Sequence, residues 1–228
     1  MNLLVISGGR HPYEETTPIL ESFLKDAGHE VTVTEDASVL ADVAGMSAYD
    51  VLAFNTLRAG DNAMTTAEQA GMSDFIKGGK GFVCIHISGC ASEDWPQYYD
   101  ITGGGWVMGQ SFHPPYGQFT VNVKNPDSPG AQGISSFTTN DELYMNLEYK
   151  DGNDVFITAE FEEGTYPRNN PQGEPIHMSG GTFPLGWTRM NGSGRVFVTL
   201  LGHNGLSFET PEFQRIVLNG VNWAKGSG

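Results

Sequence analysis

The sequence predicts an α/β fold in which an open, mostly parallel sheet carries helices on both faces, as one domain over residues 1–228. Strand and helix patterns alternate along the first 90 residues with short connections. The strand patterns are nearly continuous apolar runs, which is typical of parallel strands covered on both faces. A chain of this length can bury a full core, and no internal repeat indicates another architecture.

The first β-α unit starts at the N terminus. Leu3–Ile6 is a short apolar run that ends in two glycines, as expected for a strand followed by a tight turn. Thr17 can cap a helix, and Pro18 suits the first helical position. Apolar residues then recur at helical spacing until Gly28 ends the helix: Leu20, Phe23, Leu24 and Ala27.

The next units repeat this order up to His86. Two further runs are predicted strands: His29–Thr34 and Asp50–Phe54. The polar stretch Asn55–Met64 separates them from a helix, for which Thr65 and Glu68 supply a capping box. The glycine-rich segment 78–81 ends that helix and precedes a strand over Phe82–Ile85.

Beyond His86 the regular alternation fails. Aromatic residues, three glycines at 103–105 and Pro114-Pro115 predict an elaborated loop, a common carrier of function. The segment Phe161–Phe183 is rich in Gly, Pro and Asn, and we expect a lid without regular structure. A last helix begins at Thr210-Pro211, with Phe213, Ile216, Val217 and Trp223 facing the core. The remaining predicted strands are Gln118–Lys124, Asp154–Glu160, Leu185–Met190 and Arg195–Leu201.

Composition limits the partners. Twelve Lys and Arg against 27 Asp and Glu give a formal net charge of −15, which excludes nucleic acid and anionic membranes and favours a neutral or cationic small ligand. The alternative is an acidic solvated surface with no bearing on the substrate. Only two cysteines occur, no signal peptide is visible, and no apolar run approaches the roughly 20 residues of a membrane span. We therefore expect a cytoplasmic protein; a removed leader and a homo-oligomer both stay open.

Two histidines follow apolar strands directly. His86 follows Phe82–Ile85, and His203 follows Arg195–Leu201 by one glycine. Ligands gather at the carboxyl edge of parallel sheets, so both imidazoles could meet in one site as acid/base or metal-binding groups. The alternative is that each histidine is hydrogen-bonded to backbone and purely structural.

Further side chains could complete that site. His113 lies in a Pro- and Gly-rich loop, and Glu142 could orient a base, bind a sugar hydroxyl or complete a metal site. The alternative for His113 is an ordinary exposed loop histidine. The alternative for the Asp141–Tyr144 segment is a helix start, with its acidic residues favourably placed at the positive end of the helix. His86, His113 and His203 are of the types that bind zinc, but compact zinc-binding spacings are missing, so a divalent metal stays open. The candidate substrate-binding residues are Trp106, Tyr144, Asp141, Asn204 and Ser88.

Other chemistries find less support. Cys84 lies inside an apolar strand and reads as a small buried residue rather than a nucleophile, and Ser88 lacks the G-x-S-x-G frame of a serine hydrolase. No glycine pattern predicts a dinucleotide or phosphate cradle. Aromatic side chains cluster around the glycine-rich loop and suit sugar rings as well as ordinary packing: Trp95, Tyr98, Tyr99, Trp106 and Tyr116.

Taken together, these segments resemble the ThuA-like (trehalose utilisation) proteins. The resemblance runs from about Leu3 to Ala224, and its most specific part is Trp187–Trp223. The other segments that carry it are Gly81–His86, Phe112-His113-Pro114, Asn125-Pro126-Asp127, Gly133-Ile134, Asp141–Tyr144 and Pro184–Arg189.

The resemblance implies a flavodoxin-like, three-layer sheet of the class I glutamine amidotransferase type. The amidotransferase cysteine is replaced here by His86, which argues against glutamine hydrolysis. The family is linked to catabolism of trehalose and other disaccharides alongside sugar dehydrogenases that produce keto-sugars. We therefore expect an enzyme that hydrolyses, eliminates or isomerises a disaccharide or keto-glycoside with His86, His203, Glu142 and His113. The alternatives are a non-catalytic sugar-binding or sensor protein and, ranked last, a hydrolase that uses Cys84.

Overall fold

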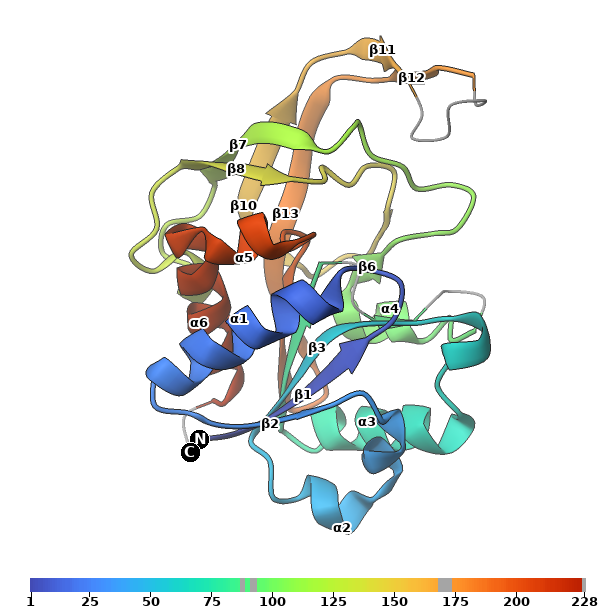
Figure 1. The fold of residues 1–228 in the computed structure, drawn as a ribbon, viewed down its shortest axis with the longest axis vertical. Helices are drawn as coiled ribbons and strands as arrows, with labels where there is room; N and C mark the ends of the chain where they lie inside the picture. Colours follow the sequence, from blue (N-terminus) through green and yellow to red (C-terminus); the bar gives the residue numbers. More distant parts are fainter. Residues whose placement is uncertain (87–88, 91–93, 168–173, 227–228) are drawn as a thin grey trace.

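The computed structural model describes residues 1–86, 89–90, 94–167 and 174–226 (Figure 1). The helices are α1 Tyr13–Asp26, α2 Val43–Met46, α3 Thr66–Lys77, α4 Tyr98–Thr102, α5 Gly205–Glu209 and α6 Pro211–Ala224. The main-sheet strands are β1 Asn2–Gly8, β2 Glu30–Thr34, β3 Val51–Arg58, β4 Gly81–Ile85, β5 Gly89–Cys90, β7 Gly117–Val123, β8 Phe137–Asp141, β10 Asp154–Phe161, β13 Gly181–Asn191 and β14 Gly194–Thr199. Two short pairs lie outside it: β6 Gly104–Gly105 with β9 Glu148–Tyr149, and β11 Gly164–Tyr166 with β12 Ile176–Met178.

The main sheet has a parallel half and an antiparallel half. Its order is β2-β1-β3-β4-β14-β13-β10-β7-β8, with β5 paired to β3 off this path. The parallel half consists of β2, β1, β3, β4 and β14. In the other half, β13, β10, β7 and β8 each run antiparallel to the strand before them in this order. The predicted α/β fold with a mostly parallel sheet is confirmed, and β14 joins the two halves.

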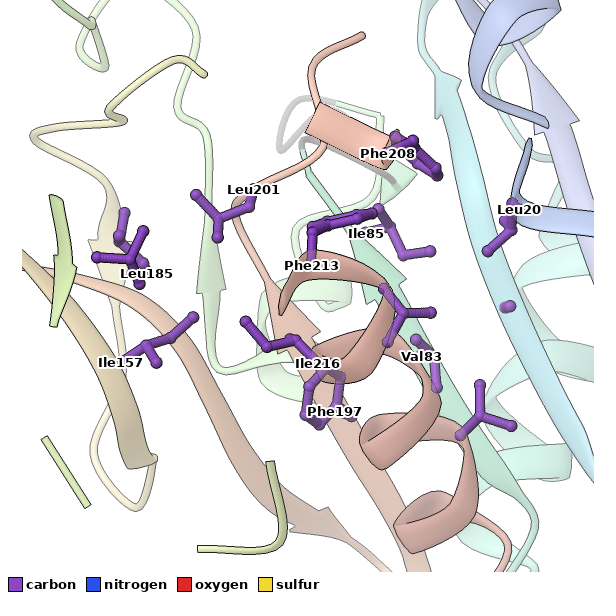
Figure 2. Packing of buried hydrophobic residues seen from close by; sticks show 14 of the residues in the cluster. Leu20, Val83, Ile85, Ile157, Leu185, Phe197, Leu201, Phe208, Phe213 and Ile216 are labelled. Carbon is purple, nitrogen blue, oxygen red and sulfur yellow. The ribbon is translucent and has the colours of Figure 1, made fainter. Parts of the chain in front are cut away.

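Helices cover both faces of the parallel half. Along β1 and β4 the side chains alternate between two hydrophobic clusters, as the twofold repeat of a strand requires. One cluster packs α1, α5 and α6 against the sheet, and Figure 2 shows its centre, where Phe213 and Ile216 of α6 meet Val83 and Ile85 of β4. The other cluster packs α3 and α4 against the opposite face. The sheet and the helices on its two faces form the expected three-layer arrangement.

The start of α1 differs from the prediction. The helix begins at Tyr13, so Pro18 lies inside it, and Thr17 does not cap it. The Pro12 carbonyl already accepts from the backbone N–H of Glu15 at 3.0 Å, and the ring of Pro12 fixes its own φ near −74°. Acidic side chains at 14 and 15 suit the positive end of the helix. The predicted helix start was therefore wrong by more than one turn.

Three further segments differ from expectation. Strand β3 continues through Arg58 into the stretch expected to be a polar connection. Asp141 is the last residue of β8 and residues 142–144 follow it, so residues 141–144 do not form the helix start that was the alternative for them. The segment expected to be a structureless lid contains the β11–β12 hairpin, which Figure 1 shows projecting beyond the end of the main sheet.

No helix among the described residues is long and apolar enough to cross a membrane.

Candidate active site

The ends of four strands bring the candidate site together. β1, β4 and β14 run in the same direction, and Thr199 of β14 pairs with Ile85 of β4, so the segments after them leave the same edge of the sheet. Those segments carry His11, His86 and His203, and the segment after β8 carries Glu142. The predicted convergence of His86 and His203 is found: their ring centroids lie 5.5 Å apart.

His86 is held in a fixed orientation at the end of β4. Its backbone adopts φ 58°, a left-handed conformation that is uncommon for a residue other than glycine and turns the chain sharply out of the strand. Its Nδ1 lies 2.8 Å from the Leu200 carbonyl oxygen, which can only accept, so Nδ1 carries the proton. In the neutral ring Nε2 then accepts a hydrogen bond from the Tyr144 hydroxyl at 2.6 Å. The imidazole is buried, with 3 % of the residue exposed.

Glu142 lies at the centre of three imidazoles. Its Oε2 is 3.2 Å from Nδ1 of His203 and 3.6 Å from Nε2 of His86, and its Oε1 is 3.4 Å from Nε2 of His113. Nδ1 of His113 donates to the Pro114 carbonyl oxygen at 2.7 Å, which fixes that ring. The structure thus gathers the three predicted catalytic histidines around the fourth predicted catalytic residue, the buried Glu142.

His11 belongs to the same group, and sequence reasoning missed it. Its ring centroid lies 5.0 Å from that of His86 and 5.3 Å from that of His203. It follows β1 after a turn through Gly8 and Gly9, so the strand-end rule that selected His86 and His203 applies to it as well.

Asp141 orients the segments that carry Glu142 and His203. Its carboxyl group is 1 % exposed and accepts three backbone N–H groups: Gly202 at 2.7 Å, Glu142 at 2.9 Å and His203 at 3.2 Å. These bonds tie the end of β8 to the end of β14. Asp141 therefore acts on the site through backbone, and its predicted contact with a substrate stays a prediction.

Burial and close contacts shift the pKa values of several side chains in the cluster. Burial, with the neighbouring imidazoles, lowers the pKa of His11 to about 3. The close polar contact with Glu142 raises the pKa of His203. Burial opposes the charge of Glu142, but contacts with His203 and His86 outweigh it and hold the pKa of Glu142 below its ordinary value. Burial raises the pKa of Tyr144 well above the usual range.

A cavity of about 300 Å³ opens beside the cluster. His86 and Tyr144 line the cavity and also belong to the cluster around Glu142. They therefore separate the cavity from Glu142 and the other imidazoles. The predicted binding residue Trp106 lines it and packs edge-on against Tyr144, with ring centroids 4.7 Å apart. The other described lining residues are mainly apolar or aromatic: Leu57, Ala59, Gly60, Cys84, Tyr98, Tyr99, Gly104, Gly105, Met108, Val198 and Leu200, with Arg10 and Asp94.

The remaining predicted residues take other positions. The Asn204 side chain caps α5, accepting from the backbone N–H groups of Leu206 at 3.1 Å and Ser207 at 3.4 Å, and its predicted role in substrate binding stays a prediction. Burial raises the pKa of the Cys84 thiol to about 12, which disfavours the thiolate that a nucleophile needs. Ser88 lies outside the described residues.

Three side chains could hold a metal ion. One ring nitrogen from each of His11, His86 and His203 lies within 4.8 Å of the others. Among the described residues His113, predicted as a zinc ligand with His86 and His203, belongs to no such group. The structure thus brings together two of the three possible metal ligands named from the sequence, His86 and His203, with His11 as the third, and metal binding stays a prediction.

The family assignment rests on nearly the whole chain. The profile of the ThuA family, described as trehalose utilisation, matches residues 2–224. The chain belongs to this family. No curated protein matches the sequence.

Solved structures share the fold of this ThuA-family chain. A putative ThuA-like protein from Parabacteroides merdae superposes with a TM-score of 0.75 at 20% identity, over 99% of this chain and 89% of that one. A putative ThuA-like protein from Bacteroides uniformis gives 0.72 at 20% identity, over 98% and 90%. A protein from Salmonella typhimurium described as cytoplasmic gives 0.63 at 15% identity, over 98% of each chain. At these identities the likeness establishes the fold alone, and the flavodoxin-like expectation is confirmed.

Proposed function

We propose that this ThuA-family chain is a carbohydrate-active enzyme that transfers a proton to or from a neutral sugar, such as a disaccharide or keto-glycoside. The observation that carries the proposal is the shared wall: His86 and Tyr144 line the cavity and also contact the Glu142 cluster. A substrate in the cavity would reach ionisable groups without entering the cluster. Membership of the trehalose utilisation family supports a sugar as the substrate class.

The cavity suits an uncharged, ring-shaped ligand. Its walls carry Trp106, Tyr98 and Tyr99, and aromatic faces stack on the apolar faces of sugar rings. Its described lining includes one arginine, Arg10, and one aspartate, Asp94, and the chain carries a formal net charge of −15. A phosphorylated substrate would be repelled rather than bound.

One hydrogen bond and one close contact define a path for a proton. The Tyr144 hydroxyl donates to Nε2 of His86 at 2.6 Å, and that nitrogen lies 3.6 Å from Oε2 of Glu142. Tyr144 is therefore the group at the cavity wall that would exchange a proton with substrate, and His86 and Glu142 would pass it on. Hydrolysis, elimination and isomerisation next to a carbonyl each require such a transfer, so the path is compatible with all three.

Removal of the Tyr144 hydroxyl tests the proposal. Purified protein is incubated with a panel of disaccharides and their keto derivatives, and products are followed by mass spectrometry and proton NMR. Tyr144→Phe keeps the ring and its packing and is expected to lower kcat at least 100-fold, the usual size of a general acid/base contribution. Tyr49→Phe, at a partly buried tyrosine outside the cavity lining, is the matched control and is expected to leave kcat unchanged.

The outcomes separate the enzyme from its alternative. Sugar-dependent thermal stabilisation without product from any member of the panel would favour the non-catalytic sugar-binding protein. Turnover that is equal in wild type and Tyr144→Phe would place the reaction elsewhere. We also propose a cytoplasmic location, in line with the described location of the Salmonella typhimurium neighbour, and no nucleic-acid or membrane partner, in line with the acidic charge.

A further inference from the structure

Three imidazoles lie close together, those of His11, His86 and His203. Of these, only His86 belongs to the proton path described above. His11, His86 and His203 come from the ends of β1, β4 and β14, and one ring nitrogen of each lies within 4.8 Å of the others. Their ring planes are nearly perpendicular: 86° between His11 and His86, 86° between His11 and His203, and 72° between His86 and His203. One nitrogen of each ring thus lies in the same small volume.

We propose that His11, His86 and His203 bind one divalent transition-metal ion of the zinc class, with Glu142 beside it. This inference goes beyond the proposed function and describes a separate, metal-loaded state of the site, because Nε2 of His86 can either accept from the Tyr144 hydroxyl or bind the ion.

The spacing of the nitrogens is close to that of a metal site. Catalytic zinc is commonly held by three protein ligands with metal–nitrogen distances of about 2.1 Å, which places two tetrahedral ligand atoms about 3.4 Å apart. The observed limit of 4.8 Å requires the rings to approach by up to about 1.4 Å. Three ligands leave the fourth position open for water or substrate.

The surroundings orient the ring of His86 as a metal site requires, and they fix the backbone of His203. The Nδ1–H of His86 donates to the Leu200 carbonyl oxygen, which leaves Nε2 as the coordinating atom; such a hydrogen bond is typical of metal-binding histidines. The backbone N–H of His203 is held by Asp141. The Tyr144 hydroxyl donates to the same Nε2 of His86, so it would have to release that lone pair when an ion binds.

The local charge favours a dication. Glu142 lies 3.2 Å from His203 and 3.6 Å from His86, so a carboxylate stands next to two of the three imidazoles, as a fourth ligand or as a hydrogen-bond partner. Imidazole donors suit zinc, iron, copper and nickel, whereas magnesium and calcium prefer oxygen donors. The donor set therefore indicates a transition metal rather than an alkaline-earth ion.

Metal titration of the full chain tests the inference. After dialysis against a chelator, Zn²⁺ binding is measured by calorimetry and Co²⁺ binding by its visible absorption, both without sugar. Wild type is expected to bind one ion per chain. His11→Asn, His86→Asn and His203→Asn are each expected to weaken binding at least 10-fold; Asn also tolerates the left-handed backbone at 86. Circular dichroism confirms that each variant is folded.

His177→Gln serves as the control, because it alters an exposed imidazole on the β11–β12 hairpin. It is expected to bind the ion as wild type does. Equal affinity of His11→Asn and wild type, loss of binding in His177→Gln, or no stoichiometric binding by wild type would each overturn the inference. Since these readouts use no substrate, they stand or fall separately from the sugar assay.

Discussion

Asp141→Asn should unfold the protein more easily, although it changes one atom of a buried side chain. The carboxyl group accepts N–H groups from Gly202, Glu142 and His203. In the variant one oxygen can still accept from Glu142 and His203, but an amide NH₂ then faces the Gly202 N–H at a site that is 1 % exposed. A buried donor without an acceptor costs about 1–3 kcal/mol, and bonds to a carboxylate are stronger than bonds to an amide. We expect a loss of about 2–3 kcal/mol in the free energy of unfolding.

Urea and thermal denaturation measure this loss. For a chain of 228 residues the expected fall in Tm is about 4–12 °C, from about 2–4 °C per kcal/mol. Asp154→Asn is the matched control, because that carboxylate is exposed and accepts from Asn125; it should change stability by less than about 0.5 kcal/mol. A loss below about 0.5 kcal/mol in Asp141→Asn would contradict the argument that these bonds hold the two strand ends together.

Three other predictions concern single residues. In Gly71→Ala the new Cβ would lie 1.9 Å from the Leu40 carbonyl oxygen, so α3 must move off the neighbouring turn at a cost of about 1–3 kcal/mol; Gly205→Ala, with no atom nearer than 3.5 Å, should be close to neutral in the same denaturation assay. Asn204→Ala removes the cap of α5 and should cost about 1 kcal/mol, whereas Asn204→Ser keeps a capping oxygen and should cost only a few tenths. Burial lowers the pKa of His29, so below pH 6.5 the unfolded chain binds a proton that the folded chain resists, and stability falls as the pH falls. The urea midpoint should therefore drop less between pH 7.5 and pH 5 in His29→Gln than in wild type, and an equal drop would contradict this.

The parallel half of the fold was predictable because its signals are local. Apolar runs, the Thr65 capping box and the glycines at 78–81 each mark one element within a few residues, and the structure places α3 and β4 where these signals put them. The start of α1 was not predictable in this way. Pro18 is typical of a first helical turn, but the packing of Leu20 and Leu24 is compatible with a helix that begins a turn earlier.

The candidate site was predictable where a strand pattern pointed at a side chain. His86 and His203 follow long apolar runs, whereas His11 follows its strand only after a glycine turn, which hides the same geometry. The capping role of Asn204 was not predicted for a related reason: helix α5 is one short turn, so the sequence shows no helical periodicity there. The backbone contacts of Asp141 depend on the approach of β8 to β14, which no local pattern encodes.

The position of β14 has a consequence for synthesis of the chain. This strand lies far beyond β4 in the sequence and leaves the ribosome well after it, yet it pairs with β4 in the interior of the sheet and not at its margin. Until it emerges, β4 presents unpaired backbone groups along one side, and such a bare edge attracts other chains. The unpaired edge of β4 therefore stays open to other chains until Thr199 is free to pair, and the imidazole cluster can assemble only after that moment.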